Sequence, residues 1–201
     1  MSGQSTKYFY LFFKPYGVLC QFTDGSGRKT LNDFGPFPTD VYSAGRLDLD
    51  SEGLLLLTND HELNHRLTDP KFEHVRSYLV QLEGIPSTKT LNRLREGVVI
   101  QGRKTRPTEV RLLEQEPDVP PRIPPIRVRK TVPTSWIDIK LHEGRNRQIR
   151  RMTASVGHPT LRLLRIAIGE LTLGRLKEGD SRRLTAEEMK RIRAELGLQG
   201  G

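Results

Sequence analysis

The sequence predicts an α+β protein with a mixed, mainly antiparallel sheet and flanking helices. Strand and helix patterns are interspersed along the 201 residues without the strict β-α alternation that a parallel sheet requires. Several predicted strands carry apolar residues at every second position, which is typical of an antiparallel sheet with one covered face. The length fits one domain or two closely packed subdomains. We expect a loose tail over residues 1–7 and one folded domain over 8–197.

The first half of the chain contains three predicted strands and one helix. The aromatic run Tyr8–Phe13 predicts the first strand, and Val41–Ala44 predicts a brief second one. Four consecutive leucines, Leu54–Leu57, are bounded by turn formers and predict a strand that is buried on both faces. Asp60 is expected to cap a short helix that ends before Pro70.

The second half continues with alternating strands and capped helices. Ser77–Leu82 and Thr134–Leu141 alternate cleanly and predict two strands. Ser87 is expected to cap one helix, and Asn146 a second helix whose apolar side carries Ile149. Further strands are expected at Val98–Ile100, at Glu109–Glu114 and within Leu161–Leu173.

A last helix should begin at the C-terminal end of the sequence. Thr185 and Glu188 have the spacing of a capping box, in which each side chain bonds the backbone N–H of the other residue. The helix should end before Gly197.

The composition points to a polyanionic partner. The net charge is +9, the sequence pI is near 9.9, and the mean hydropathy is −0.54. Nucleic acid is the first candidate, because cationic side chains that neutralise phosphates release condensed counterions. Cys20 is the only cysteine, which excludes an internal disulfide and a cysteine zinc site. A reducing, cytoplasmic location follows.

One polar stretch lies directly before the leucine strand. Gly45–Gly53 carries Arg46, Asp48, Asp50 and Glu52, so these side chains belong to a loop anchored to a rigid strand. Three interpretations compete. A calcium loop has a similar spacing but lacks the glutamate at its twelfth position. A turn whose side chains bond their own backbone is the simplest interpretation. The third is that one aspartate is a nucleophile or base.

The segment from Glu116 to Pro133 is rich in proline, which excludes a helix or a central strand. It contains Arg127, Arg129 and Lys130. Two interpretations stay open, a solvated run of charges and a stiff loop that contacts phosphates.

Three arginines lie near the start of the helix that follows the strand Thr134–Leu141. Arg147, Arg150 and Arg151 oppose the helix dipole there, so helix stability does not explain them. A bound phosphate or a carboxylate partner would.

Several of these motifs together resemble a known family. G-R-L-D-L-D-S-E-G-L-L-L-L-T-N-D, K-P-Y-G-V, R-S-Y-L-V and R-N-R-Q-I-R-R-M occur in the order found in RsuA-like pseudouridine synthases. The resemblance is strongest to the branch of large-subunit pseudouridine synthase E. Many members begin with an S4 RNA-binding domain, and we expect none here. The resemblance implies a pseudouridine synthase catalytic fold, with two subdomains around a central cleft.

The resemblance also implies roles for individual residues. Asp48 would be the catalytic carboxylate, Tyr78 would stack on the detached uracil, and Arg150 would pair with Asp48. Arg46 would fill the vacancy left by a flipped uridine, and Lys14 would lie beside the RNA. The phosphate contacts would come from the cations of the proline-rich segment and from the arginines flanking Arg150, namely Arg127, Arg129, Lys130, Arg147 and Arg151.

The implied reaction is isomerisation of one uridine in 23S ribosomal RNA. We expect a monomer with no metal and no organic cofactor, because the reaction includes no redox step and no hydrolysis. Two other classes stay open, a non-catalytic ribosomal RNA-binding or assembly factor and a metal-dependent RNA hydrolase that uses Asp48, Asp50 and Glu52.

Overall fold

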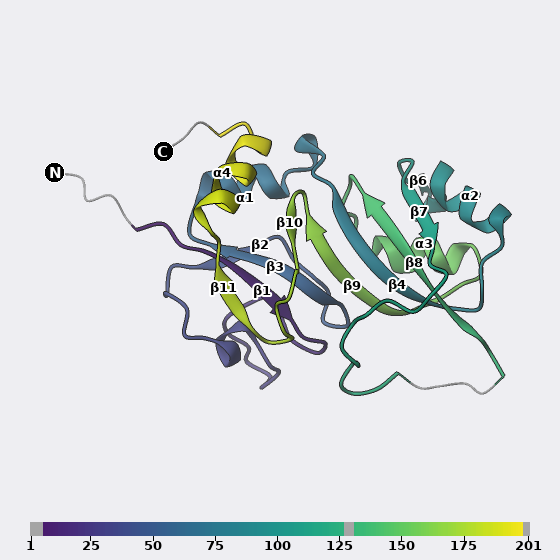
Figure 1. The fold of residues 1–201 in the computed structure, drawn as a ribbon, viewed down its shortest axis with the longest axis horizontal. Coiled ribbons are helices and arrows are strands. Elements are labelled where there is room, and N and C mark those ends of the chain that lie inside the picture. The colour runs from purple at the N-terminus through teal and green to yellow at the C-terminus, as the bar shows by residue number, and fades with distance from the viewer. Residues whose placement is uncertain (1–5, 127–130, 199–201) are drawn as a thin grey trace. The chain divides into compact units, whose positions relative to one another are not determined.

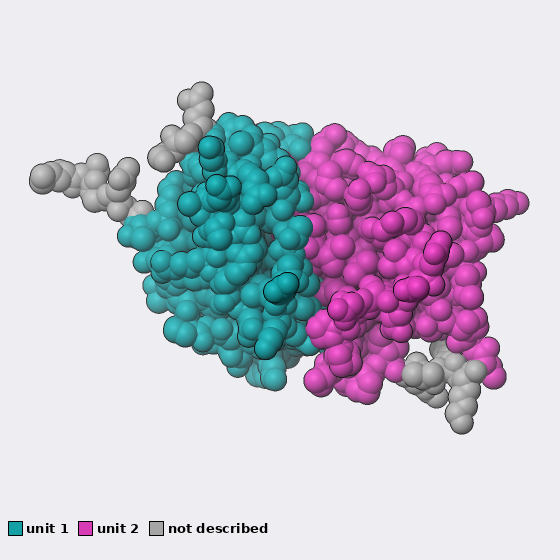
Figure 2. Space-filling model, in the orientation of Figure 1, with its two compact units in different colours: residues 1–72, 169–201 teal, residues 73–168 magenta. Residues whose placement is uncertain are grey.

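The computed structural model describes residues 6–126 and 131–198 and divides into two compact units. Unit 1 comprises residues 1–72 and 169–201, and unit 2 comprises residues 73–168 (Figures 1 and 2). Each unit combines strands with helices, and the ladders within each unit are antiparallel. The predicted α+β class is confirmed. Arg127, Arg129 and Lys130 lie outside the described residues.

Unit 1 is built on a sheet with β1 and β3 at its centre. In this unit β11 pairs with β1, β1 with β3, and β3 with β2. The elements of unit 1 are β1 (Phe9–Lys14), η1 (Leu31–Phe34), β2 (Tyr42–Ala44), β3 (Glu52–Thr58), α1 (His61–Thr68), η2 (Pro70–Phe72), β10 (Leu171–Thr172), β11 (Ser181–Arg183) and α4 (Ala186–Glu195).

Strand β3 is buried along its whole length, as the run of leucines predicts. Leu55 and Leu57 face a cluster that contains Phe12, Leu31 and Val41. Because side chains alternate along a strand, Leu54 and Leu56 point to the opposite face, and all four leucines are 0% exposed. A strand covered on both faces holds the loop that precedes it.

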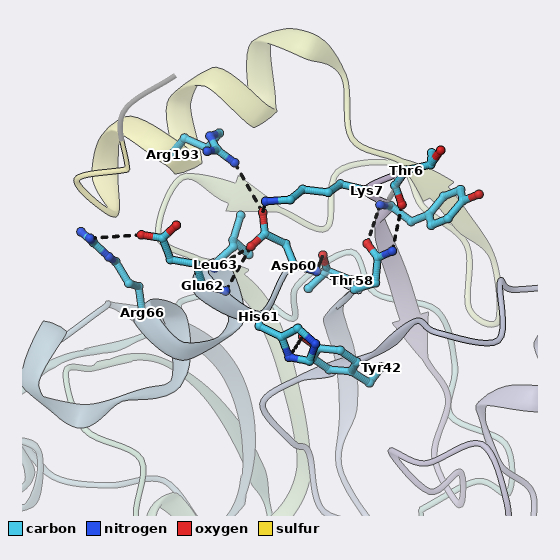
Figure 3. Close-up of polar contacts among 12 residues, drawn as sticks. Thr6, Lys7, Tyr42, Thr58, Asp60, His61, Glu62, Leu63, Arg66 and Arg193 are labelled. Carbon is cyan, nitrogen blue, oxygen red and sulfur yellow. Dashed lines mark hydrogen bonds and ion pairs between the residues drawn. The ribbon is translucent and has the colours of Figure 1, made fainter. Parts of the chain in front are cut away.

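Asp60 joins both ends of the chain to helix α1 (Figure 3). It accepts hydrogen bonds from the backbone N–H groups of Glu62 and Leu63, which confirms it as the N-cap. The same carboxylate meets Lys7 Nζ at 2.8 Å and Arg193 Nη1, from α4, at 3.5 Å. Burial alone would raise the pKa of Asp60, but the hydrogen bonds from Lys7 and Leu63 lower it overall.

Helix α4 begins with the predicted capping box. The Thr185 hydroxyl accepts from the Glu188 backbone N–H, and the Glu188 carboxylate accepts from that of Thr185. Arg182 donates to both oxygens of Glu188, and this pair lowers the pKa of Glu188 to about 2. At the other end of α4, Arg66 of α1 donates to the carbonyl of Leu196.

In unit 2, the strands β9, β4, β8 and β7 pair antiparallel in that order, and β5 pairs with β6. Helices α2 and α3 add Leu91, Leu94, Ile149 and Met152 to a core cluster with the inward side chains of these strands. The elements of unit 2 are β4 (Arg76–Glu83), α2 (Thr88–Glu96), β5 (Val99–Ile100), β6 (Arg103–Lys104), β7 (Glu109–Leu112), β8 (Thr134–Leu141), α3 (Gln148–Ser155) and β9 (Thr160–Ile168). The predicted strand Thr134–Leu141 and the Ser87 cap of α2 are confirmed.

The predicted start of α3 is wrong. The helix begins at Gln148, and its N-cap position is Arg147, in the left-handed conformation with φ 50°. The Asn146 side chain accepts from Arg151 Nη2 at 2.8 Å instead of capping the backbone. The backbone N–H of Arg145 donates a hydrogen bond to Gln148 Oε1 at 2.9 Å. A tight turn held by side chains therefore replaces the Asn cap.

None of the described helices is long and apolar enough to span a membrane.

The junction at Asp60 leads to a prediction about stability. Asp60→Asn keeps an oxygen that can cap α1 but loses the charge that faces Lys7 and Arg193, and we expect a loss of about 1 kcal/mol. Asp60→Ala also loses the cap, and we expect a loss of about 2–3 kcal/mol in the free energy of unfolding. Urea denaturation measures both.

The control for Asp60 is Glu62→Gln, which removes a solvent-exposed partner of Arg66. Its cost should stay below about 0.5 kcal/mol. Equal losses for Asp60→Asn and Asp60→Ala would show that the cap contributes nothing beyond the charge.

Candidate active site

The polar loop of unit 1 lies between two glycines with positive φ, Gly45 at 79° and Gly53 at 110°. Side chains other than glycine rarely adopt these angles, so the loop enters and leaves by turns that suit these two residues. Asp48 is half-buried and Arg46 is exposed. The Ser51 backbone N–H donates to the Asp48 carbonyl at 3.0 Å. The loop is thus a compact turn that leads directly into β3.

Lys14 lies beneath this loop and is 0% exposed. Its Nζ donates to the carbonyl oxygens of Ser51 at 2.7 Å and Pro15 at 2.9 Å. Burial lowers the pKa of Lys14 from 10.5 to about 8, against attraction from Cys20 and from the carboxylates at Glu52, Asp50 and Asp48. The ammonium group is thus turned toward the backbone of the loop, and the RNA contact of Lys14 stays a prediction.

Tyr78 lies in unit 2, on strand β4. It is half-buried and packs against the core cluster that includes Ile149 and Met152 of α3. Its cross-strand partner on β9 is Arg165, which is 3% exposed. Arg76 lies two residues before Tyr78. Burial lowers the pKa of Arg76, attraction to Tyr78 raises it, and repulsion from Arg165 lowers it.

The three arginines around the start of α3 differ in their surroundings. Arg147 is exposed, whereas Arg150 and Arg151 are half-buried. Arg150 Nη1 donates to the carbonyl of Thr160 at 3.4 Å, which ties the helix to β9. Arg151 binds Asn146. The three arginines therefore differ in exposure, and the phosphate contacts of Arg147 and Arg151 stay predictions.

Arg165 is a further candidate site residue, which the motifs did not single out. It lies in β9, where Leu163 and Leu164 precede it, and its side chain is buried beside Tyr78. A charged residue in an apolar strand is a signal that the sequence contains, because buried charges require partners. The same signal marks Arg162, which is 4% exposed and donates to the carbonyl of Pro120 at 2.8 Å.

The predicted site residues thus form two groups. Asp48, Arg46 and Lys14 are on or under one loop of unit 1. Tyr78, Arg150, Arg147 and Arg151 belong to unit 2. The pairing of Asp48 with Arg150, one residue from each group, stays a prediction.

Comparison with known proteins decides the family. The family model for RNA pseudouridylate synthase matches residues 8–155, which include the loop of Asp48, the strand of Tyr78 and helix α3. The chain belongs to the RNA pseudouridylate synthase family.

Relatives within this family are similar over most of the chain. A protein of Xanthomonas axonopodis pv. citri named ribosomal large subunit pseudouridine synthase E is 56% identical over 168 residues, which is 83% of this chain and 88% of that protein. Ribosomal large subunit pseudouridine synthase B of Bacillus subtilis is 40% identical over 187 residues, 92% of this chain and 71% of that protein. The crystal structure of a pseudouridylate synthase aligns with a TM-score of 0.79 and 28% identity over 96% of this chain and 76% of that chain. The family identified from the motifs is confirmed.

Lys14 leads to a prediction about pH. Since its folded-state pKa of about 8 lies below the usual 10.5, the unfolded chain holds more protons than the folded synthase between these values. The contribution of Lys14 to the free energy of unfolding therefore rises as pH increases from about 8 to 10.5 and is smallest below pH 8. Lys14→Met should remove this rise.

The measurement is the difference in urea stability between the native protein and Lys14→Met across the alkaline range. Lys29→Met, a change at an exposed lysine of the same unit, is the control. A difference that stays constant from neutral to alkaline pH would contradict the assignment of a lowered pKa to Lys14.

Proposed function

We propose that the protein isomerises one uridine of 23S ribosomal RNA to pseudouridine, with Asp48 as the catalytic carboxylate. The observation that carries the proposal is the loop Gly45–Gly53, anchored to a buried strand, in a chain 56% identical over 168 residues to a relative named for the large ribosomal subunit. A rigidly held carboxylate suits a reaction at one atom of a large substrate.

The chemistry requires an ionised carboxylate beside the ribose. The N1–C1′ bond of uridine breaks, the uracil turns, and a C5–C1′ bond forms. The proton on C5 is then lost and N1 gains one, so the product is an isomer of the substrate. Asp48 either attacks C1′ or removes the proton at C2′. Arg150 would keep this carboxylate ionised, since an arginine close to a carboxylate lowers the carboxylate pKa by roughly 1–3 units.

The target uridine must leave its helix before it can react, because bases stacked in A-form RNA are poorly accessible. Arg46, two residues before Asp48, is exposed. It would fill the space that the flipped uridine leaves in the RNA helix. Tyr78 would stack on the detached uracil and keep it near C1′.

The surrounding cations would hold the RNA backbone. Arg147 is exposed at the start of α3, and Arg151 would bind a neighbouring phosphate. Arg127, Arg129 and Lys130 would add contacts from the proline-rich segment. The net charge of +9 fits a polyanionic substrate. We further propose that the enzyme works as a monomer in the cytoplasm, without a metal or an organic cofactor.

The nucleophile is tested by Asp48→Asn and Asp50→Asn, a matched pair within the same loop. Asp48→Asn removes the reacting charge and should abolish pseudouridine formation in 23S ribosomal RNA, while leaving RNA affinity nearly unchanged. Asp50→Asn should keep substantial activity. Pseudouridine mapping after incubation with each purified variant measures both.

The same experiment separates the other classes of function. Native protein that binds the RNA but forms no pseudouridine would contradict the proposal and indicate a binding or assembly factor. Activity lost on treatment with EDTA would indicate a metal-dependent enzyme. Equal loss in the two variants would overturn the choice of Asp48 over Asp50.

Arg150 is tested against its neighbour Arg151, which is turned by about 100° around the helix. If Arg150 pairs with Asp48, Arg150→Ala should lower the single-turnover rate even at saturating enzyme, because the carboxylate loses its partner. Arg150→Lys keeps the charge without the planar guanidinium, so its rate should lie between those of the native protein and Arg150→Ala. Arg151→Ala should change RNA binding more than the rate.

The measurement is single-turnover pseudouridine formation with the enzyme well above its dissociation constant. An Arg150→Ala enzyme that reacts at the full rate under this condition would remove Arg150 from the catalytic residues.

A further inference from the structure

The loop that carries Asp48 is attached to one neighbouring segment, residues 14–20, at three successive alternate positions. The Gly17 backbone N–H donates to the carbonyl of Leu49 at 2.8 Å. Cys20 Sγ accepts from the Leu47 backbone N–H at 3.2 Å and donates to the Leu47 carbonyl at 3.3 Å. Lys14 Nζ donates to the carbonyl of Ser51. The contacts at Leu47 and Leu49 therefore lie on the two sides of Asp48.

The contact from Lys14 differs from the other two because it uses a buried charge. Lys14 is the last residue of β1, and its cross-strand partner is Gly53. Cross-strand partners share a face of the sheet, so no side chain of β3 lies directly opposite Lys14. The ammonium group therefore reaches the carbonyl of Ser51, at the point where the loop enters β3.

Stability alone does not account for a lysine at this position. Burying an ammonium is costly unless it is paired and hydrogen-bonded, and burial is the largest influence on its pKa. A methionine would fill a similar volume without a charge to desolvate. The lysine instead offers two properties that methionine lacks, donors for Ser51 and Pro15 and a positive charge beside the carboxylates of the loop.

We propose that Lys14 is a positioning residue that fixes the place of Asp48 through the carbonyl of Ser51. The Ser51 backbone N–H is bonded to the Asp48 carbonyl at 3.0 Å, so a displacement of Ser51 shifts Asp48 with it. This inference rests on the proposed function, in which Asp48 reacts with the ribose. A displacement of about 1 Å at a reacting group can lower a rate by about 100-fold.

The test compares two variants of Lys14 with a control in the same strand. Lys14→Met keeps a long chain but loses the donors and the charge. Lys14→Gln keeps a donor and loses the charge. Leu11→Met introduces the same side chain at another fully buried position of β1, whose cross-strand partners Leu56 and Arg182 are not part of the loop; volume-conserving exchanges of this kind are well tolerated.

The expected result is a separation of rate from affinity. Lys14→Met should lower the single-turnover rate by about 10- to 100-fold, while its RNA dissociation constant stays within about twofold. Lys14→Gln should recover part of the rate, and Leu11→Met should react as the native protein does. All variants are assayed at a temperature at which circular dichroism shows them folded. If Lys14→Met does not fold, Lys14→Gln carries the test.

Asp48→Asn, assayed in parallel, separates this inference from the proposed function. If Asp48→Asn is inactive and the folded Lys14 variants react at the native rate, the inference is overturned and the proposed function stands. An equal loss of rate in Leu11→Met would also overturn it, because the effect would then be a general loosening of β1. If Asp48→Asn forms pseudouridine, the proposed role of Asp48 fails, and the role of Lys14 fails with it.

Discussion

The complete burial of strand β3 is the constraint on which the candidate site depends. Leu54–Leu57 are covered on both faces, and β3 pairs with β1 on one side in a continuous register from Phe9 to Lys14. A shift of one residue would turn every leucine to the other face. The first residue of β3, Glu52, is therefore fixed in place. The loop that carries Asp48 leads into this fixed point. Lys14, at the matching end of β1, then holds the loop at Ser51.

The candidate arginines of unit 2 are also attached to a packed part of the structure. Helix α3 packs Ile149 and Met152 into the core of the sheet, and Arg150 on the same helix is tied to the carbonyl of Thr160. Tyr78 and Arg165 are cross-strand partners. Side chains that are fixed by packing need little further ordering when a substrate binds. In each unit, the candidate residues are therefore attached to strands or helices that pack into a hydrophobic cluster of that unit.

Most elements could be predicted because their signals are local. The leucine run, the Asp60 cap and the Thr185 capping box depend on residues next to one another in sequence, and all three are confirmed. The predicted Asn146 cap was wrong because a turn held by Gln148 competes for the same backbone. The burial of Lys14 could not be predicted, since it involves a contact with Ser51, which lies 37 residues away in the sequence. The site residues came from motifs, which mark chemistry but not which cations are exposed.

A structure of the protein bound to its RNA, with the target uridine in place, would test the central claim most directly. The account predicts that the Asp48 carboxylate lies about 3–3.5 Å from C1′ or from the hydrogen-bearing C2′ of that nucleotide. It also predicts that Lys14 remains bonded to the carbonyl of Ser51, as it is without RNA. A ribose that contacts Asp50 or Glu52 in place of Asp48, or none of these carboxylates, would contradict it.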